Sequence, residues 1–185
     1  KSGMVYALDP ANDGALIWEQ RAGSGGTMGG IHYGMSASAE KLFVGVSDLP
    51  TNNPYNIGPA HPGIHALSLS TGEVLWRNDL PNQCEEGPFL CWPGISAAVS
   101  STTDLVFAGG LDGILRAFDT EDGSILWETN TRQSFGLRNG IQATGGSIES
   151  DGPVIVNGQV FITSGYEKWG EAPGNVVLVY SLNGE

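Results

Sequence analysis

The stretch DGILRAFDTEDGSILWE, residues 112–128, decides the fold. Two apolar runs flank a Thr-Glu-Asp-Gly turn, and the second run ends in a tryptophan. Alternating apolar residues on both sides of an Asp-Gly turn predict two antiparallel strands joined as a β-hairpin. Nearly the same pattern occurs in GMVYALDPANDGALIWE, residues 3–19, and in PGIHALSLSTGEVLWR, residues 62–77. The chain is therefore built from an internal repeat.

Each copy has an alanine before the turn and a tryptophan after it. These pairs are Ala7 and Trp18, Ala66 and Trp76, and Ala117 and Trp127. A fourth copy begins with Val179 in the place of the alanine. The small alanine leaves room for a bulky ring from a neighbouring strand, so an aromatic ring at the same place predicts the same packing contact in each repeat. Trp127 is accordingly expected to be a core residue.

Two further strands precede each full hairpin, with Phe43, Phe107 and Phe161 in equivalent places. Each unit therefore has four antiparallel strands, and the alanine recurs after 59 and 51 residues. A four-stranded unit repeated at this period is the signature of a β-propeller blade. An ordinary β-sandwich is the alternative, but a sandwich has no reason to repeat the same Ala-Gly-Trp pattern. The fold class expected is all-β, a β-propeller of four-stranded antiparallel blades.

Both ends of the repeat array are unfinished. We expect one partial propeller domain over residues 1–185, with the third and fourth strands of a first blade at 3–20 and full blades at 35–79 and 95–130; the first three strands of a last blade follow at 153–182. Closed propellers need about four to eight blades. We expect a C-terminal part of a larger polypeptide, completed by a missing N-terminal half or by oligomeric copies.

Charge narrows the choice of partners. The formal net charge is −12 at pH 7. Nucleic acids and anionic membranes attract basic patches, so neither is expected as a partner. No run of eighteen apolar residues is present, so no membrane-spanning segment is expected.

Cys84 and Cys91 are the two cysteines of the chain. They are too few for a structural zinc site, and no haem-attachment motif accompanies them. Either they form a disulfide, which would indicate an oxidising compartment such as the periplasm, or they are two buried free thiols. The loop between them is rich in Pro, Gly and acidic residues, which favours the disulfide.

A functional site is expected on one face of the propeller. Five long loops fall on that face, at residues 21–35, 48–63, 80–94, 131–147 and 165–174. Their aromatic rings could stack on a planar ligand, and a guanidinium suits carboxylates. As an alternative, the aromatic residues merely cover strand ends. The residues gathered there are His32, Tyr33, Asn52, His61, Trp92, Arg138, Asn139, Tyr166 and Trp169.

The sequence resembles the pyrroloquinoline quinone (PQQ) propeller repeat proteins, and most closely the C-terminal part of polyvinyl alcohol dehydrogenase-type quinohaemoproteins. The similarity lies in GGIHYGMSA, CWPGISAAV, LDGILRAFDTEDGSILWE, NGIQATGGSIESDGPVIVNG and SGYEKWGEAPGNVVLVYS, in the order of that family. The resemblance implies a periplasmic or secreted alcohol dehydrogenase that binds PQQ near the propeller axis, often with Ca²⁺. It also implies that a cytochrome c accepts the electrons, with haem c only in a missing domain.

Among the residues of the loop face, cofactor binding is expected of His32, Tyr33, Trp92, Arg138, Asn139, Tyr166 and Trp169, which are compatible with the resemblance; no metal ligand or catalytic base is identified. The pair Cys84 and Cys91 matches the family pattern and so implies a disulfide. The sequence departs from the family at Gln142 and Thr144, where members often carry lysines.

Three functions remain open from the sequence. The first is a segment of a PQQ-dependent alcohol dehydrogenase that oxidises small or polymeric alcohols. The second is a non-catalytic PQQ-like propeller that acts as a periplasmic scaffold for other proteins. The third is a propeller enzyme of another class, because a fold does not fix a function.

Overall fold

The computed structural model of the chain describes residues 1–50, 53, 54, 56–136, 140–166 and 168–181, which form strands and loops. Within these residues no helix is long and apolar enough to cross a membrane. The strands are β1 (Met4–Asp9), β2 (Ala15–Arg21), β3 (Met35–Ala37), β4 (Lys41–Val46), β5 (Gly63–Ser68), β6 (Val74–Asp79), β7 (Ser100–Ser101), β8 (Leu105–Gly109), β9 (Ile114–Asp119), β10 (Ile125–Asn130), β11 (Ser134–Gly136), β12 (Gln142–Thr144), β13 (Val154–Val156), β14 (Gln159–Ser164) and β15 (Val176–Ser181).

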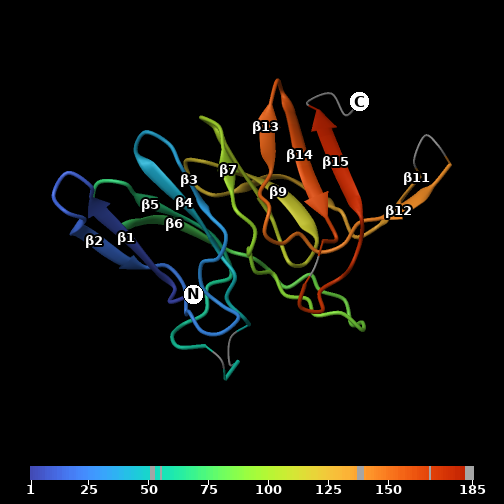
Figure 1. Cartoon of the computed structure of the whole chain (residues 1–185), viewed down its shortest axis with the longest axis horizontal. Helices are drawn as coiled ribbons and strands as arrows, with labels where there is room; N and C mark the ends of the chain where they lie inside the picture. Colours follow the sequence, from blue (N-terminus) through green and yellow to red (C-terminus); the bar gives the residue numbers. More distant parts are fainter. Residues whose placement is uncertain (51–52, 55, 137–139, 167, 182–185) are drawn as a thin grey trace.

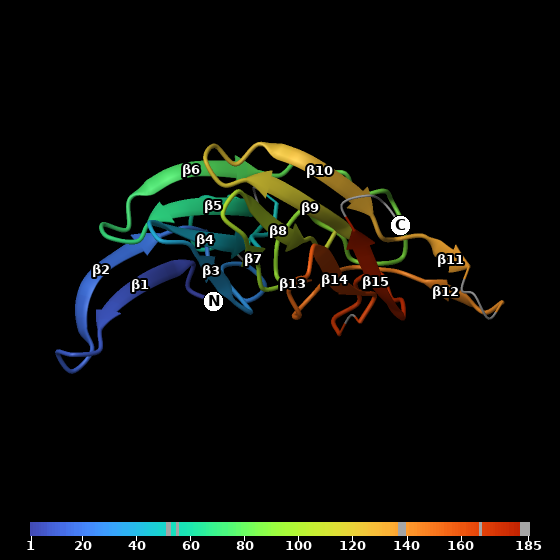
Figure 2. The ribbon, with the colours of Figure 1, turned by 90° about the horizontal axis from the view of Figure 1, so that it is seen from above.

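The strands form antiparallel sheets that follow one another along the chain (Figure 1). Strands β3–β4–β5–β6 and β7–β8–β9–β10 make two four-stranded sheets, β1–β2 a two-stranded sheet, and β13–β14–β15 a three-stranded sheet. Figure 2 shows these sheets side by side along an arc, with β2, β6 and β10 on its convex side and β3, β7 and β13 on its inner side. The predicted all-β fold of four-stranded antiparallel units is confirmed. We number these sheets in chain order: β1–β2 is blade 1, β3–β6 is blade 2, β7–β10 is blade 3 and β13–β15 is blade 4.

One backbone hydrogen bond occurs at the same place in three blades and defines equivalent residues. An N–H one or two residues after the second strand donates to the carbonyl of a residue before the first strand of the same blade. The bonds run from Ser47 to Gly30, from Leu111 to Gly94 and from Gly165 to Ser147, at 2.8 to 2.9 Å. Because this bond recurs, residues counted from Gly30, Gly94 and Ser147 occupy equivalent positions.

The tryptophan of each hairpin lies opposite the alanine, as the repeat predicts. Ala66 pairs with Trp76, and the register shifts directly afterwards, so a β-bulge follows the pair. The same pairing joins Ala7 to Trp18 and Ala117 to Trp127.

The rings of Trp18 and Trp76 are held by the hairpin turn of the next blade. The indole N–H of Trp76 donates to the Thr120 carbonyl at 3.1 Å, and that of Trp18 to the Leu69 carbonyl at 2.9 Å. A Cβ on Gly123 would lie 2.5 Å from the Trp76 ring, and Gly123 has a φ of +74°. Glycine is therefore required there by both the turn and the ring.

The prediction that Trp127 is a core residue is wrong. Its ring is 39% exposed and meets Tyr180 edge-on, with ring centroids 5.2 Å apart. By the repeat, Leu182 and Gly184 correspond to the carbonyl and glycine that hold Trp76, and both lie outside the described residues. The prediction treated the ring's own hairpin as its cover, whereas at Trp18 and Trp76 the turn of the next blade covers the ring.

Apolar side chains fill the junctions between blades. Between blades 2 and 3, Phe43 and Ile64 pack against Val106 and Phe118, all fully buried. Burial of one such side chain contributes about 1.5–3 kcal/mol. Similar clusters join blade 1 to blade 2 around Val5, Val44 and Leu67, and blade 3 to blade 4 around Phe107, Leu115 and Ile162. The blades are thus held together mainly by burial.

The two ends of the arc carry exposed apolar side chains. Blade 4 exposes Val154, Val156, Val177 and Val179, and blade 1 exposes Tyr6, Leu8, Leu16 and Ile17. The corresponding side chains of the inner blades, such as Leu67 and Phe118, are fully buried because a neighbouring blade covers them.

Two local features complete the fold. Strands β11 and β12 form a small hairpin inside loop 131–147, which the sequence analysis describes only as a long loop. Cys84 and Cys91 form a disulfide, with their Cα atoms 5.8 Å apart, so the predicted bond is confirmed. On the chain-entropy estimate, closing a loop this short contributes about 2–3 kcal/mol.

Candidate cofactor-binding site

The long loops contact one another on one face of the arc, toward the bottom of Figure 1. The N–H of Leu90 donates to the Gly170 carbonyl at 2.8 Å, which joins loop 80–94 to loop 165–174. The N–H of Ala172 donates to the Ser147 hydroxyl at 3.1 Å, which joins loop 165–174 to loop 131–147. Backbone groups of separate blades are therefore fixed relative to one another at this face.

Three polar side chains lie in equivalent positions at the inner edge of blades 2, 3 and 4. His32, Ser96 and Glu149 each follow the recurrent bond's acceptor residue by two positions. Nδ1 of His32 lies 2.8 Å from the Ser96 hydroxyl, and its Nε2 lies 3.0 Å from the Gly29 carbonyl. Ser96 and Glu149 are buried. The repeat thus brings an imidazole, a hydroxyl and a carboxylate to adjacent blades.

Tyr33 stands beside this row with its ring half exposed. Its backbone N–H donates to the Ser96 carbonyl at 3.4 Å, and its ring meets His32 edge-on at 6.2 Å. Burial raises the pKa of the Tyr33 phenol, and the nearby carboxylates of Glu149 and Glu171 raise it further. The phenol therefore stays protonated at neutral pH and can donate a hydrogen bond.

Glu171 is a carboxylate from loop 165–174 that is only 2% exposed. Its Oε2 accepts a hydrogen bond from the Trp169 N–H at 3.0 Å. A buried carboxylate needs such partners, because desolvation penalises its charged form. Burial also lowers the pKa of His32, so a neutral imidazole is favoured at this inner edge. We call His32, Tyr33, Ser96, Glu149 and Glu171 the inner rim.

The remaining predicted site residues lie in different surroundings. Trp92 is buried, and its indole N–H donates to the Ser47 carbonyl at 3.2 Å. It therefore fixes loop 80–94 against blade 2. Tyr166 and Trp169 are exposed on loop 165–174. Arg138, Asn139 and Asn52 lie outside the described residues.

His61 belongs to a separate cluster at the end of β6. Its Nδ1 lies 2.8 Å from Oδ2 of Asp79, and Nε2 of the fully buried His65 lies 3.5 Å from Oδ1. The two imidazoles, His65 first, lower the pKa of Asp79 to about 2. This cluster fixes the end of loop 48–63 to blade 2.

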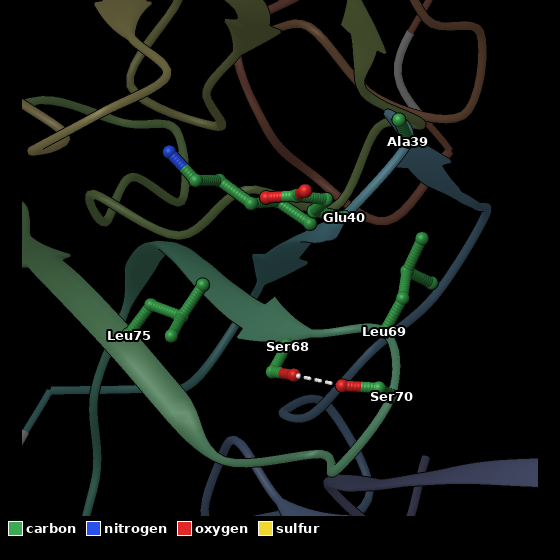
Figure 3. A pocket seen from close by; sticks show the side chains of 7 residues that line it. Ala39, Glu40, Ser68, Leu69, Ser70 and Leu75 are labelled. Carbon is green, nitrogen blue, oxygen red and sulfur yellow. Dashed lines mark hydrogen bonds between the residues drawn. The ribbon is translucent and has the colours of Figure 1, made fainter.

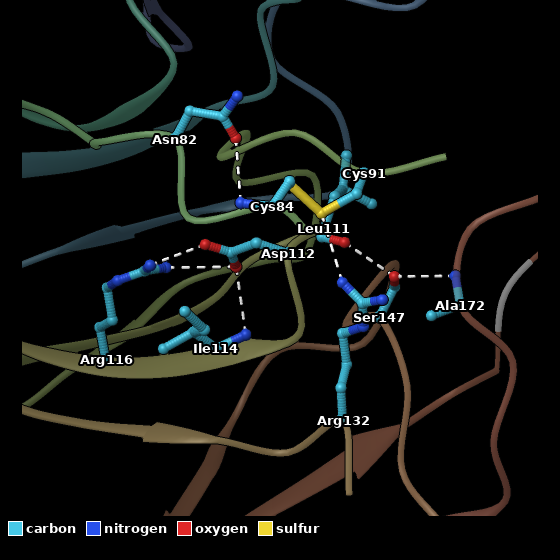
Figure 4. The surroundings of a disulfide bond; sticks show 10 residues. All are labelled: Asn82, Cys84, Cys91, Leu111, Asp112, Ile114, Arg116, Arg132, Ser147 and Ala172. Carbon is cyan, nitrogen blue, oxygen red and sulfur yellow. Dashed lines mark hydrogen bonds and ion pairs between the residues drawn. A yellow bond between two sulfur atoms is a disulfide. The ribbon is translucent and has the colours of Figure 1, made fainter. Parts of the chain in front are cut away.

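The disulfide anchors the loop that approaches the inner rim (Figure 4). A guanidinium nitrogen of Arg132 lies 3.4 Å from Cys91 Sγ. Close by, Arg116 donates to both carboxylate oxygens of Asp112, at 2.7 and 3.3 Å, and both side chains are almost fully buried. The first contact joins loop 131–147 to loop 80–94, and the second lies within blade 3.

The residues Ser96, Glu149 and Glu171 were not singled out from the sequence. A signal for two of them exists in the repeat, because Gly-Ile-His, Gly-Ile-Ser and Ser-Ile-Glu recur at residues 30–32, 94–96 and 147–149. No repeat marks Glu171, since its position depends on the path of loop 165–174.

Two grooves occupy the opposite face, between the short turns. One has a volume of about 540 Å³ and runs from the turn at Ser38–Lys41 to Ser101–Thr103 and Glu121; the second, about 340 Å³, lies beside Ser68–Ser70 and Leu75 (Figure 3). Small and hydroxylated side chains line both, and Lys41 is paired with Glu121 at 2.7 Å. Neither groove includes an inner-rim residue.

Gln142 and Thr144 occupy the positions where members of the resembled family often carry lysines. Both are exposed in β12, and the Thr144 N–H donates to the Asn175 side chain at 3.3 Å. Among the described residues, no group of three His, Cys, Asp or Glu side chains could hold a metal ion.

Comparison with known proteins shows to which family the repeat belongs. The profile of the PQQ-type repeat family described as "Outer membrane protein assembly factor BamB" matches residues 1–147. The chain belongs to this family. Polyvinylalcohol dehydrogenase of a Pseudomonas species is 40% identical over 195 residues, which cover 100% of this chain and 30% of the relative. The predicted resemblance is thus confirmed, and the chain spans less than a third of that relative.

Solved structures of this family have the same fold. BamB from Moraxella catarrhalis matches with a TM-score of 0.57 and 18% identity, over 89% of this chain and 38% of that one. A quinohemoprotein alcohol dehydrogenase from Pseudomonas putida HK5 matches with a TM-score of 0.55 and 21% identity, over 83% and 19%. At these identities the likeness concerns the fold, and the blades are those of a β-propeller.

Proposed function

We propose that the chain is the C-terminal segment of a PQQ-dependent alcohol dehydrogenase. One observation carries the proposal: the repeat of a family related to polyvinylalcohol dehydrogenase brings His32, Ser96 and Glu149 into one row at the inner edge of the blades. In this proposal residues 1–185 form one partial propeller domain, and further blades of the polypeptide or oligomeric copies cover the apolar ends of the arc.

The side chains of the inner rim suit a planar quinone. An aromatic ring can stack on the quinone ring, and hydroxyl groups can donate hydrogen bonds to the quinone carbonyls. The half-exposed Tyr33 ring offers a face for stacking, and the Tyr33 and Ser96 hydroxyls can donate hydrogen bonds. We propose these residues, with Trp92, Tyr166 and Trp169 in supporting positions and Arg138 and Asn139 as partners for carboxylates, as the cofactor-binding set. A bound quinone would supply the acceptor for two electrons.

The carboxylates of the inner rim suggest the remaining chemistry. Glu149 is proposed to accept the proton of the alcohol hydroxyl, because it belongs to the row that faces the cofactor. Glu171 is proposed as a positioning residue, since its Oε2 is already engaged by the Trp169 N–H. Ca²⁺ is proposed to accompany a quinone that carries carboxylates, because it prefers oxygen ligands; those ligands are proposed to come from the rest of the polypeptide.

The expected test is reconstitution of the intact polypeptide with PQQ and Ca²⁺, followed by dye reduction with secondary alcohols. Glu149→Gln should lower kcat/KM about 100-fold, the usual contribution of a positioned proton acceptor, while quinone binding persists. Glu73→Gln, on an exposed turn of the opposite face, is the matched control and should change nothing. Absence of quinone binding by the intact protein would contradict the proposal.

A scaffold function is the second candidate, and two observations favour it. The description of the matching family profile names an outer membrane assembly factor. In addition, Gln142 and Thr144 stand where the resemblance leads one to expect lysines. Such a protein would capture a partner from periplasmic extract without binding quinone. Capture without quinone binding would therefore select this function over the first.

Location and electron acceptor follow from the first proposal. A disulfide is typical of oxidising compartments, so we place the protein in the periplasm or outside the cell. The acceptor is proposed to be a cytochrome c, either a further domain or a separate protein. Reduction of added cytochrome c in step with alcohol oxidation would check this step.

A further inference from the structure

Asp48 is a fully buried carboxylate just after β4, at the start of a long loop. Its Oδ1 accepts a hydrogen bond from the Gly30 N–H at 2.9 Å. Its Oδ2 accepts two hydrogen bonds, from the Ser24 N–H at 2.6 Å and from the His61 N–H at 3.0 Å. A buried carboxylate is costly unless such donors surround it. One side chain therefore holds backbone groups of two long loops.

Two glycines let loop 21–35 come close to this carboxylate. A Cβ on Gly23 would lie 2.9 Å from Asp48 Oδ1, and a Cβ on Gly29 would lie 3.2 Å from the same atom. Both distances are shorter than an ordinary van der Waals contact, so a side chain at either position would displace the carboxylate. The loop is therefore shaped around Asp48.

The equivalent carboxylate of blade 3 has different partners. Asp112 follows the donor of the recurrent backbone bond, as Asp48 does in blade 2. Asp112 accepts from the Ile114 N–H at 3.1 Å and pairs with Arg116 at 2.7 Å, both in its own blade. The repeat thus supplies the aspartate, whereas its engagement with loop 21–35 belongs to blade 2.

The peptide unit that Asp48 holds is also the one that fixes His32. The Gly30 N–H donates to Asp48, and the Gly29 carbonyl lies 3.0 Å from His32 Nε2. This N–H and this carbonyl belong to the same peptide unit, which is planar. Fixing the N–H therefore fixes the direction of the carbonyl, and with it the imidazole.

The carbonyl selects one tautomer of His32. A carbonyl oxygen can only accept a hydrogen bond, so Nε2 of the imidazole carries the proton. Burial lowers the pKa of His32, which favours the neutral ring with a single N–H. Nδ1 is then an acceptor, and it lies 2.8 Å from the Ser96 hydroxyl. The opposite tautomer would turn this position of the inner rim from an acceptor into a donor.

We propose that Asp48 is a positioning residue of the inner rim: through the Gly29–Gly30 peptide it holds His32 as the Nε2–H tautomer, with Nδ1 as a hydrogen-bond acceptor. The contribution of this tautomer to alcohol oxidation rests on the proposed function. The tautomer itself does not, because it follows from contacts within the chain.

The first test is an NMR measurement on the intact polypeptide without quinone. The histidines are isotopically labelled, and the His32 signals are assigned from their absence in His32→Gln. Heteronuclear correlations of the imidazole rings at neutral pH should show a protonated Nε2 and an unprotonated Nδ1. A protonated Nδ1 in the native protein would overturn the proposal, whatever the variants do.

Asp48→Asn is the informative variant, because an amide has a single accepting oxygen. Two N–H groups, those of Ser24 and His61, converge on Oδ2, so the amide oxygen should face them. The amide nitrogen then faces the Gly30 N–H, and the Gly29 carbonyl loses its anchor. The ratio of the Nε2–H to the Nδ1–H tautomer should fall about tenfold, the value of one hydrogen bond to a charged group. Lower stability with an unchanged tautomer would overturn the proposal.

Three further variants complete this test. Asp79→Asn removes the other carboxylate that contacts His61 and should leave the tautomer unchanged. Ser96→Ala should also keep the Nε2–H form, and its loss there but not in Asp48→Asn would place the control on Ser96 instead. If Asp48→Asn does not fold, Gly29→Ala crowds the same carboxylate and should shift the tautomers in the same direction.

Turnover gives the second arm. In the intact quinone-loaded protein Asp48→Asn should lower kcat/KM about tenfold, with Asp79→Asn as the unchanged control. A shifted tautomer in a protein that binds no quinone would support the role of Asp48, and only the proposed function would fail. Unchanged turnover despite a shifted tautomer would overturn the inference and leave the function standing.

Discussion

The junction between blades 2 and 3 and the junction between blades 3 and 4 are built from the same repeat but are closed differently. At the first, Trp76 donates to the Thr120 carbonyl and covers Gly123. At the second, Trp127 meets Tyr180 edge-on and is 39% exposed, and the turn after β15 lies outside the described residues. At the first junction, the turn of the following blade thus holds the repeat tryptophan.

The two junctions also differ in the residue before the pairing alanine. In blade 3 this residue is Arg116, fully buried and paired with Asp112. In blade 4 it is Leu178, which packs on the apolar cluster around Leu115. Blade 3 therefore carries a buried ion pair of its own, which leaves little tolerance for loss of a partner, whereas Leu178 of blade 4 makes apolar contact.

Removing Arg116 should have the largest effect. Arg116→Ala leaves the Asp112 carboxylate buried and unpaired, so we expect a loss of about 3–5 kcal/mol in the free energy of unfolding. Urea denaturation followed by fluorescence would measure it. The double variant Arg116→Met with Asp112→Asn should recover more than half of this loss, because it removes the buried charge as well. No recovery would show that the ion pair is not the reason for the loss.

Removing the covered tryptophan should rank second. Trp76→Ala should cost about 3 kcal/mol, because a partly buried ring and its hydrogen bond are lost. Trp127→Ala is the matched variant and should cost about 1 kcal/mol, since its ring is exposed. Both are measured by urea denaturation. Equal losses would mean that the turn of the next blade does not determine tryptophan burial.

Changing the glycine under the covered ring should come third. Gly123→Ala places a Cβ against Trp76 and forces a non-glycine residue to a φ of +74°. We expect a loss of about 2 kcal/mol, of which about 1 kcal/mol comes from the backbone conformation. Gly14→Ala is the control: it has the same φ and nothing within 4 Å, and it should show the backbone part alone. Identical melting temperatures for the two variants would remove the ring contact from the explanation.

The cluster of His61, His65 and Asp79 within blade 2 should show the smallest effect, as a pH dependence. The pKa of Asp79 is lowered to about 2 in the folded state from 3.8, so its stabilising contribution is present above pH 3.8 and is lost as pH falls toward 2. The melting temperature of Asp79→Asn should lie slightly below that of the wild type at pH 5 and equal it near pH 2. A difference that persists at pH 2 would assign the effect to shape, not charge.

Much of the fold follows from local pattern. The hairpins, the alanine–tryptophan pairs and the blade strands are set by alternation and turn residues, which act over a few positions of the chain. The disulfide was predicted from the loop between Cys84 and Cys91 together with the family resemblance. The hairpin β11–β12 was missed because its strands are only three residues long and lie in a Gly-rich loop.

The residues of the candidate site could be predicted only in part from the sequence. His32 and Tyr33 were predicted and lie in the inner rim, whereas Trp92 is buried in the loop packing and His61 binds Asp79. His32 and Ser96 are 64 residues apart along the chain, so their contact depends on how successive blades are placed around the arc. No local pattern encodes that placement.

The sequence by itself determined the repeat, the strand order within each blade and the residues available at each repeated position. The tertiary structure alone decided which of those residues meet, which tryptophans a neighbouring turn holds and which long loops contact one another. The physical reason is that hairpin formation depends on neighbours in the chain, whereas contacts between blades depend on burial of apolar faces that belong to different repeats.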